Sequence, residues 1–334
     1  MKKISAYAAA CLIAFTSLAG CQTKAPAPEA EKAAENGGKM TIVTTIFPEY
    51  DWVRNVLGEE ADTFDVQMLL GNGVDLHSYQ PTVDDIMKIS ECDMFVYVGG
   101  ESNAWVTDAL KEAANSDMVV VDLLDVLGDR VREEEIVEGM HAEEEHSDDA
   151  GEDEGPEYDE HVWLSLKNAE QCVLAIADSV SKLDPDNREI YESNAGAYTE
   201  KLKALDQEYE EAVSAGKTDT LLFGDRFPFR YLVEDYGLKY YAAFAGCSAE
   251  TEASFETIIF LAEKVDELGL ECVLTIDNSD QKIAQTIVQN TKNGDQKILT
   301  LDSMQAATYD QAAGGTEYIS VMESNLSVLK EALS

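Results

Sequence analysis

The sequence predicts an α/β fold of two similar parallel-sheet lobes joined by a long rigid helix, with a metal site in the cleft between the lobes. Short β-branched and apolar runs alternate with helical segments of about ten residues, before and again after the middle of the chain. This alternation indicates parallel sheets covered by helices. A helical pattern of some thirty residues separates the two series. At about 1.5 Å per residue it would extend about 45 Å, enough to brace two lobes.

The first lobe is predicted from patterns that begin at Met40. Strands are expected where β-branched or aromatic residues cluster, at 41–46, 64–70, 93–98 and 118–121. Helices are expected between these strands, at 48–57, 81–90 and 104–114. Gly58 closes the first of these helices, and Pro81 stands at the start of the second.

An acidic insert follows at 133–160. It contains fifteen carboxylates, no Lys or Arg, and the histidines His141 and His146. Self-repulsion and a shortage of apolar residues predict that the insert is disordered. A helix is then expected at 166–183. Asp184 and Pro185, a good N-cap and a good first helical residue, begin the long helix, which continues to about residue 214.

The second lobe repeats the strand–helix alternation after Gly216. Strands are expected at 220–223, 240–244, 272–276 and 297–301. Helices are expected at 229–236, 255–268, 281–291 and 318–333. The predicted organisation is therefore an N-terminal lobe over 40–183, a linker helix over 184–215 and a C-terminal lobe over 216–334.

The beginning of the chain has the pattern of a bacterial lipoprotein signal. Lys2 and Lys3 precede an apolar stretch at 6–19, which is typical of a secretory signal peptide over 1–20. The letters LAGC end at Cys21 and resemble a lipobox, so Cys21 would carry the lipid (palmitate). An ordinary signal peptide with an incidental cysteine is the alternative. Residues 21–39 have the composition of a flexible tether, and the protein is expected outside the cell, anchored to its membrane.

Charge and cysteine content limit the function. The formal net charge of −42 argues against nucleic acid as a partner and suits a protein that attracts cations. The four cysteines after the signal, Cys92, Cys172, Cys247 and Cys272, match no CxxC zinc motif. A disulfide between Cys247 and Cys272 is possible in an oxidising compartment, and small buried thiols are the equal alternative.

Histidine occurs only four times, and two of the four stand in distinctive words, VDLHSYQP around His77 and YDEHVWLS around His161. Neutral imidazole is the commonest transition-metal ligand near pH 7. In open parallel sheets, ligands bind beyond the carboxyl ends of the strands. His77 follows one expected strand end, and three further acidic positions follow others: Asp225 (next to Arg226), Asp277 and Asp302. The pattern predicts one metal ion in a shared cleft.

Several words together resemble the zinc/manganese-binding lipoproteins of bacterial ABC transporters, a family that includes the periplasmic zinc-uptake proteins. They are TTIFPEYD at 44–51, HSYQPT at 77–82, DMFVYVG at 93–99, HVWLS at 161–165, FRYL at 229–232 and LDS at 301–303. The resemblance implies that His77, His161 and Asp302 are metal ligands. It also implies that the acidic insert collects metal.

The third ligand departs from the family pattern, because Arg226 stands where a histidine or glutamate is expected. A guanidinium cannot ligate a cation. Three alternatives remain open: Asp225 supplies an oxygen, Glu49 enters the cleft, or a water fills the position while Arg226 pairs with an acid. Asp225 is the favoured substitute.

The resemblance implies that the protein is a monomer that captures Zn²⁺, or alternatively Mn²⁺, outside the cell and delivers it to an ABC permease and its ATPase. Two imidazoles with carboxylates suit zinc and are acceptable for manganese. Arg226 leaves open a homologue that has shifted to a metal chelate or an anion. An adhesin is a further alternative. A zinc hydrolase is disfavoured because the sequence has no HExxH motif, so no enzymatic activity is expected.

Overall fold

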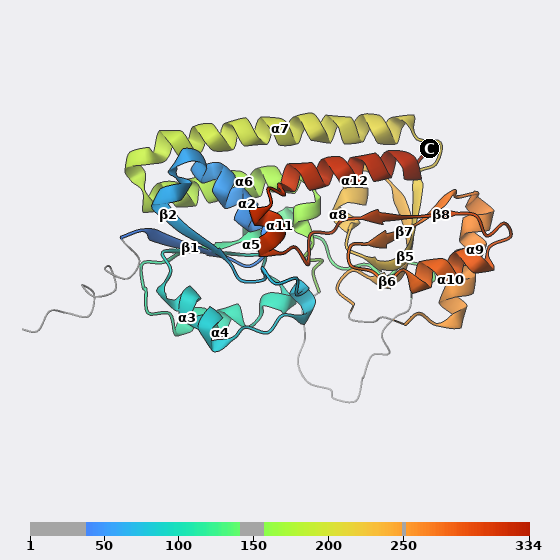
Figure 1. The fold of residues 1–334 in the computed structure, drawn as a ribbon, viewed down its shortest axis with the longest axis horizontal. Helices are drawn as coiled ribbons and strands as arrows, with labels where there is room; N and C mark the ends of the chain where they lie inside the picture. Colours follow the sequence, from blue (N-terminus) through green and yellow to red (C-terminus); the bar gives the residue numbers. More distant parts are fainter. Residues whose placement is uncertain (1–37, 141–156, 249–251) are drawn as a thin grey trace, which may run out of the picture. The chain divides into compact units, whose positions relative to one another are not determined.

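The computed structural model describes residues 38–140, 157–248 and 252–334, and residues from Met40 onward form one compact unit. The predicted signal peptide, Cys21, and the insert histidines His141 and His146 lie outside the described residues. Within the described ranges there are two sheets of four parallel strands each, connected by helices (Figure 1). The predicted α/β class with two parallel sheets and a long helix is confirmed.

The first sheet has the strand order β2-β1-β3-β4. Its strands are β1 (Met40–Thr44), β2 (Phe64–Met68), β3 (Met94–Tyr97) and β4 (Val119–Asp122). The helices of this region are α2 (Phe47–Leu57), α3 (Val83–Glu91), α4 (Val106–Lys111), α5 (Leu123–Leu127) and α6 (Leu166–Leu183). Alternate side chains of the strands enter different cores: Ile42 packs in the core that includes α2 and α6, whereas Val43 packs with residues of α3 and α4. Helices therefore cover both faces of this sheet.

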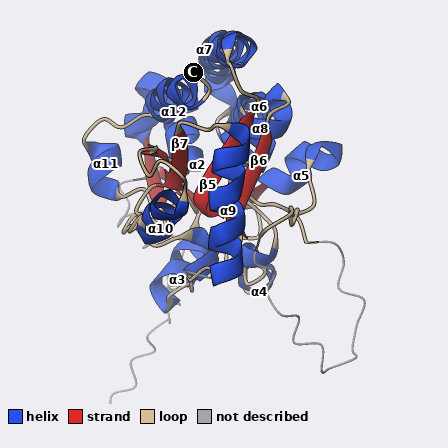
Figure 2. Cartoon of the chain, turned by 90° about the vertical axis from the view of Figure 1, so that its right-hand side faces the viewer, coloured by secondary structure: helices blue, strands red, loops and turns tan. Residues whose placement is uncertain are grey.

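The second sheet has the order β6-β5-β7-β8, which repeats the topology of the first. Its strands are β5 (Thr220–Phe227), β6 (Lys239–Ala245), β7 (Cys272–Ile276) and β8 (Lys297–Leu301). Its helices are α8 (Arg230–Tyr236), α9 (Phe255–Leu268), α10 (Lys282–Asn290), α11 (Tyr309–Ala313) and α12 (Tyr318–Ala332). Leu222 packs with α9 and α10, whereas its neighbour Leu221 faces the core that includes α8 and α12. Figure 2 shows these helices around the strands of the sheet.

The long helix α7 (Arg188–Ala215) runs past both sheets (Figure 1). Asn194 donates to the carbonyl of Val56 in α2 at 2.9 Å. Near the other end of α7, the Tyr209 hydroxyl donates to the carbonyl of Met322 in α12 at 2.6 Å. One continuous hydrophobic core joins α7 to one face of each sheet. The helix therefore braces the two halves of the compact unit. None of the described helices is both long and apolar enough to cross a membrane.

The structure extends one strand beyond its predicted end. β5 continues from Phe223 through Asp225 and Arg226 to Phe227, with an irregular register between Phe223 and Arg226. The expectation that Asp225 and Arg226 follow the strand was therefore wrong. Gly224 makes the continuation possible, because a Cβ there would lie only 2.6 Å from the Cα of Ala284 in α10. The short helices α5 and α11 were not predicted.

The two ends of the acidic insert are ordered. Glu133 forms an antiparallel bridge with Tyr158, and the amide of Glu134 donates to the carbonyl of Glu157 at 2.9 Å. Glu135 forms an ion pair with Arg230. The prediction of disorder throughout 133–160 therefore fails at these flanks, where backbone pairing outweighs like-charge repulsion. The rest of the insert, 141–156, lies outside the described residues.

Glu49 does not enter the cleft, which removes one of the alternatives for the third ligand. The carboxylate of Glu49 accepts from the amide of Thr45 at 2.7 Å and from the amide of Ile46 at 3.2 Å, so it caps its own helix, α2. The side chain is completely buried. Burial raises the pKa of Glu49 to about 8, although the hydrogen bonds from Ile46 and Thr45 oppose this shift.

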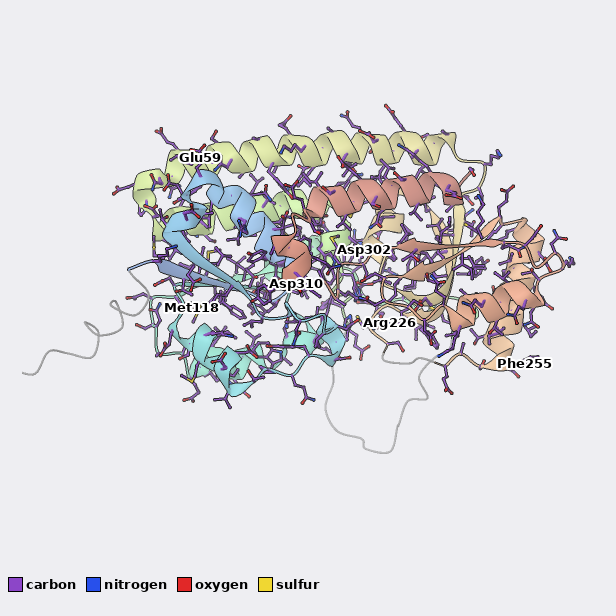
Figure 3. The ribbon with its side chains drawn as sticks, in the orientation of Figure 1. Glu59, Met118, Arg226, Phe255, Asp302 and Asp310 are labelled. Atoms are coloured by element: carbon purple, nitrogen blue, oxygen red, sulfur yellow. The ribbon has the colours of Figure 1, made fainter. Side chains whose placement is uncertain are left out.

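We expect Glu49→Gln to flatten the pH dependence of stability. The pKa of Glu49 is raised in the folded state, so its contribution is fully present below about pH 4.5 and is lost as pH rises through about 8. Over this window the free energy of unfolding of the parent should fall with rising pH more steeply than that of Glu49→Gln. The difference should be up to about 1.4 kcal/mol per pH unit. Denaturant unfolding from pH 5 to 8 measures both. Glu59→Gln, at an exposed carboxylate (Figure 3), is the control. Equal slopes for the parent and Glu49→Gln would contradict the account.

Candidate metal-binding site

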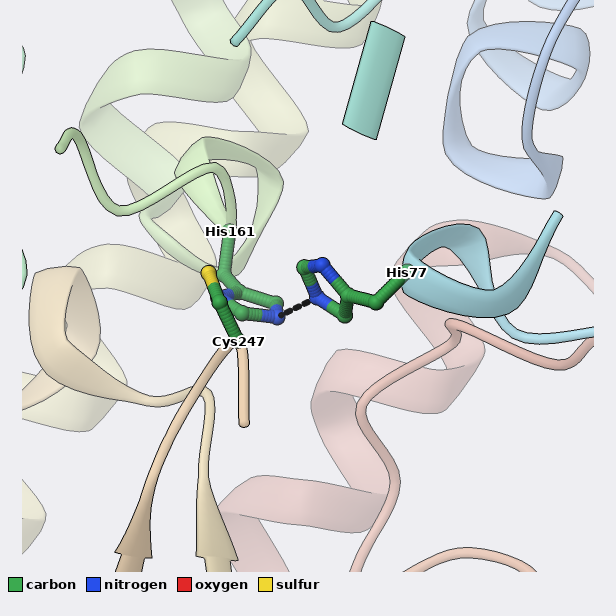
Figure 4. A group of neighbouring side chains, drawn as sticks. All are labelled: His77, His161 and Cys247. Carbon is green, nitrogen blue, oxygen red and sulfur yellow. Dashed lines mark hydrogen bonds between the residues drawn. The ribbon is translucent and has the colours of Figure 1, made fainter. Parts of the chain in front are cut away.

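His77 and His161 lie side by side, although 84 positions separate them in the chain. His77 lies in a short 3-10 turn after β2, where the carboxylate of Asp75 accepts from its backbone amide at 3.0 Å. His161 lies just before the turn that leads into α6. The two Nε2 atoms are 3.0 Å apart (Figure 4). The His161 side chain is fully buried and that of His77 is 6 % exposed.

The second nitrogen of each imidazole has its own oxygen partner. Nδ1 of His161 lies 2.8 Å from Oδ1 of Asp159, and because an ionised carboxylate only accepts, Nδ1 carries the proton. Nδ1 of His77 lies 2.8 Å from Oγ of Ser102 and 3.6 Å from Oε2 of Glu160. Metal-binding histidines commonly have such a partner on the nitrogen that does not ligate. Nε2 of His161 is therefore left as an electron-pair donor, and Nε2 of His77 lies next to it.

The imidazole of His77 is kept neutral. Burial, followed by the neighbouring imidazole of His161, lowers the pKa of His77 to about 3. Neutral imidazole is the form that ligates a metal. Near pH 7, His77 therefore carries no charge that would repel a cation.

Gln305 is a site residue that the sequence did not reveal. Its side-chain nitrogen lies 3.2 Å from Nε2 of His77 and also contacts Nε2 of His161. The side chain is 3 % exposed, in the loop after β8. Its NH₂ group points its hydrogens at both imidazoles, so it occupies the place where a cation would bind. Rotation of the amide would present its oxygen instead. Residue type held no signal for Gln305, because glutamine is an uncommon metal ligand.

Asp302 lies in the same loop as Gln305, and the structure does not bring it into the histidine group. Its Oδ1 accepts from the amide of Met304 at 2.8 Å, and its own amide donates to Asn325 at 2.8 Å. Burial and then the charge of Asp277 raise the pKa of Asp302 to about 6. The contacts of Asp302 therefore shape the loop that presents Gln305. Its predicted role as a ligand has no support in these contacts.

Arg226 is neutralised by an acid, as one of the alternatives for the third position required. Its guanidinium lies 2.7 Å from Oδ2 of Asp75 and donates to the carbonyl of Ser248 at 3.3 Å. Although burial of Asp75 opposes the effect, the charge of Arg226 helps to hold the pKa of that carboxyl below its usual range. Figure 3 shows Arg226 and Asp302 on the side of the second sheet that faces the first.

Asp225, the favoured substitute ligand, is also outside the histidine group. Its Oδ1 accepts from the amide of Arg226 at 2.9 Å, and its Oδ2 is enclosed without a hydrogen-bond partner among the described residues. Asp225 lines a cavity of about 440 Å³ that Asp75, Asp277 and Gln305 also line. The cavity lies beside the imidazole pair, and the two carboxylates that were predicted to complete the metal site are not part of that pair's immediate surroundings.

Cys247 lies beside the histidines. One potential ligand atom from each of His77, His161 and Cys247 falls within 4.8 Å of the others. Cys247 is half-buried and its thiol is free, as is that of Cys272, so the possible disulfide between them is not formed. Cys247 follows the carboxyl end of β6 whereas Cys272 starts β7, and both strands run parallel to β5. The two thiols therefore lie at opposite edges of one sheet.

The family model described as zinc-uptake complex component A, periplasmic (ZnuA) matches residues 42–332. This chain belongs to the ZnuA family. It is 34 % identical over 331 residues to the zinc-binding lipoprotein AdcA of Streptococcus pneumoniae, covering 99 % of this chain. It is 28 % identical to the high-affinity zinc uptake system protein ZnuA of Bacillus subtilis, covering 97 % of this chain and 95 % of that protein. The chain spans 61 % of the length of AdcA.

A solved structure supports the same assignment. The Zn(II)-bound ZnuA-like domain of Streptococcus pneumoniae AdcA has a TM-score of 0.68 and 32 % identity, covering 89 % of this chain and 99 % of that domain. The family resemblance drawn from the sequence words is confirmed. In this chain, the imidazole pair described above lies within the part that matches the ZnuA family.

Removing the partner of Arg226 should be costly. We expect Asp75→Asn to lower the free energy of unfolding by about 1–2 kcal/mol, because a charged hydrogen bond is lost while the guanidinium stays 18 % exposed. Asparagine can still accept from the amide of His77. Chemical denaturation measures the loss, and adding Arg226→Met should recover much of it. Asp108→Asn, which breaks the exposed pair with Lys111, should cost about 0–0.5 kcal/mol. A similar cost for both pairs would contradict the account.

Proposed function

We propose that the protein captures Zn²⁺ outside the cell and delivers it to an ABC permease powered by an ATPase. The observation that carries this proposal is the pair of buried imidazoles, His77 and His161, whose Nε2 atoms lie 3.0 Å apart. The zinc-binding names of its relatives and the Zn(II)-bound AdcA domain support the choice of ion. Two imidazoles with further ligands from nitrogen, sulfur or oxygen suit zinc.

The donor set favours zinc over manganese. Mn²⁺ prefers carboxylate, carbonyl and water oxygens. Neither predicted oxygen ligand belongs to the histidine group: Asp302 accepts from the Met304 amide and Asp225 from the Arg226 amide. The carboxamide of Gln305 contacts both imidazoles through its nitrogen and carries a neutral oxygen on the same group. A site centred on two imidazole nitrogens fits the proposed zinc cargo.

The contacts of Arg226 argue against a shift to an anion. Its charge is matched by Asp75 at 2.7 Å, so it does not present an uncompensated positive group. The adjacent cavity of about 440 Å³ is lined by Asp75, Asp225, Asp277 and Asp280. A cavity with this much carboxylate would repel an anionic ligand or an anionic metal chelate. A bare cation is therefore the proposed cargo.

The remaining parts of the proposal concern the whole protein in its cell. We propose that a signal peptide over 1–20 directs export and that a lipid on Cys21 anchors the chain through the tether at 21–39. The protein would act as a monomer that carries an ion, without enzymatic activity and without acting as an adhesin. The lobe boundaries at 183 and 216 belong to the same proposal.

Zinc binding should depend on the imidazoles and not on Asp302. Calorimetric titration of the metal-free protein with Zn²⁺ should give one saturable site, and His77→Ala should weaken it at least about 100-fold, because an imidazole ligand is lost. Asp302→Asn is the matched control and should bind like the parent. Failure of the parent to saturate at micromolar zinc would overturn the function. Parent-like binding by His77→Ala would overturn the site, and a large loss in Asp302→Asn would restore Asp302 as a ligand.

A further inference from the structure

The loop that follows β6 brings a thiol to the imidazole pair. One ligand atom of Cys247 lies within 4.8 Å of a ring nitrogen of His77 and of His161. Figure 4 shows the sulfur of Cys247 alongside the His161 ring, with the His77 ring on the other side of the His161–His77 contact. His77 and Cys247 come from strand ends of different sheets. The thiol is therefore presented to the site across the boundary between the two lobes.

Two local features hold Cys247 in this place. Its amide donates to Oε1 of Glu134 at 2.8 Å, which ties the loop to the ordered base of the acidic insert. Gly246, directly before it, lies against the imidazole: a Cβ there would be 3.1 Å from Cε1 of His161 and 2.8 Å from the carbonyl of Phe227. Such a close approach of backbone to ring requires glycine. The glycine therefore allows the chain to pass close to His161 and places Cys247 next to it.

The surroundings of Cys247 differ from those of a core cysteine. Cys92, Cys172 and Cys272 are buried, whereas Cys247 is half-buried. Cys247 lines a cavity of about 260 Å³ together with His77, Ser102 and a group of carboxylates. Those carboxylates are Glu101, Glu134, Glu157 and Glu160. Glu160 is 2 % exposed, and its Oε2 is without a hydrogen-bond partner among the described residues. A cation could approach the imidazoles through this acidic cavity and pass the thiol.

We propose that Cys247 is the third protein ligand of the bound ion, in the position that Arg226 cannot fill. The inference rests on the proposed function, because it completes the same site. On binding, the S–H bond breaks, a sulfur–metal bond forms, and the proton passes to solvent through the carboxylate-lined cavity. Two imidazoles and one thiolate select zinc over manganese, because thiolate is a soft ligand. Gln305 or water takes the remaining position.

Cobalt(II) provides a direct test, because a thiolate bound to Co²⁺ gives a charge-transfer band in the near ultraviolet that imidazole and oxygen ligands do not give. The purified, metal-free protein is titrated with Co²⁺ under reducing conditions. The parent should develop the band with saturation at one ion. Cys247→Ser should bind Co²⁺ without the band and should bind Zn²⁺ at least about tenfold more weakly. Cys272→Ala, which removes a thiol at the other edge of the sheet, should keep the band.

The outcomes separate this inference from the function on which it rests. A parent that binds Co²⁺ and Zn²⁺ without a thiolate band would overturn the role of Cys247 and leave the proposed zinc capture standing. A parent that binds neither ion would overturn the proposed function itself. A band retained in Cys247→Ser would also overturn the assignment. Because the parent's spectrum alone decides whether sulfur is a ligand, the test does not depend on the folding of the serine variant.

Discussion

The close approach of two imidazole nitrogens is the constraint on which the rest of the site depends. Nε2 of His77 and Nε2 of His161 lie 3.0 Å apart, and the Asp159 carboxylate fixes the proton of His161 on its other nitrogen. The lone pair of a buried imidazole nitrogen needs a hydrogen-bond donor or a cation beside it. The amide of Gln305 provides it in the structure. His77 follows a strand of the first sheet and Gln305 a strand of the second. Their contact therefore joins the two lobes at the site where a cation would bind.

The fold supplies the stiffness that such an arrangement requires. Both sheets present one face to a common core with α7, and α7 hydrogen-bonds at one end to α2 and at the other to α12. The histidines are carried by short turns next to this core, and Trp163, two residues after His161, donates to the carbonyl of Ser303 at 2.8 Å. Ligands on turns supported by packed elements are held in productive geometry. The loop with Gln305 is fixed to the segment with His161 in this way.

Much of this architecture follows from local patterns that a sequence displays. The strands at 272–276 and 297–301 and the helix at 255–268 have the predicted bounds, because their apolar runs end at clear breakers. Contacts between residues far apart in the chain could not be predicted from such local patterns. β5 passes through Asp225 and Arg226 because Gly224 fits against α10, which no local pattern reveals. Cys247 and Gln305 reach the histidines through loop geometry, and their residue types alone could not separate them from ordinary loop and core residues.

Anomalous diffraction at the zinc absorption edge, from crystals of the zinc-loaded protein, tests the central claim most directly. The account predicts one strong peak at bonding distance, about 2.0–2.1 Å, from Nε2 of both His77 and His161. The sulfur of Cys247 should lie about 2.3 Å from the same peak. A peak over the carboxylates of Asp225 and Asp277, away from the imidazole pair, would contradict the account.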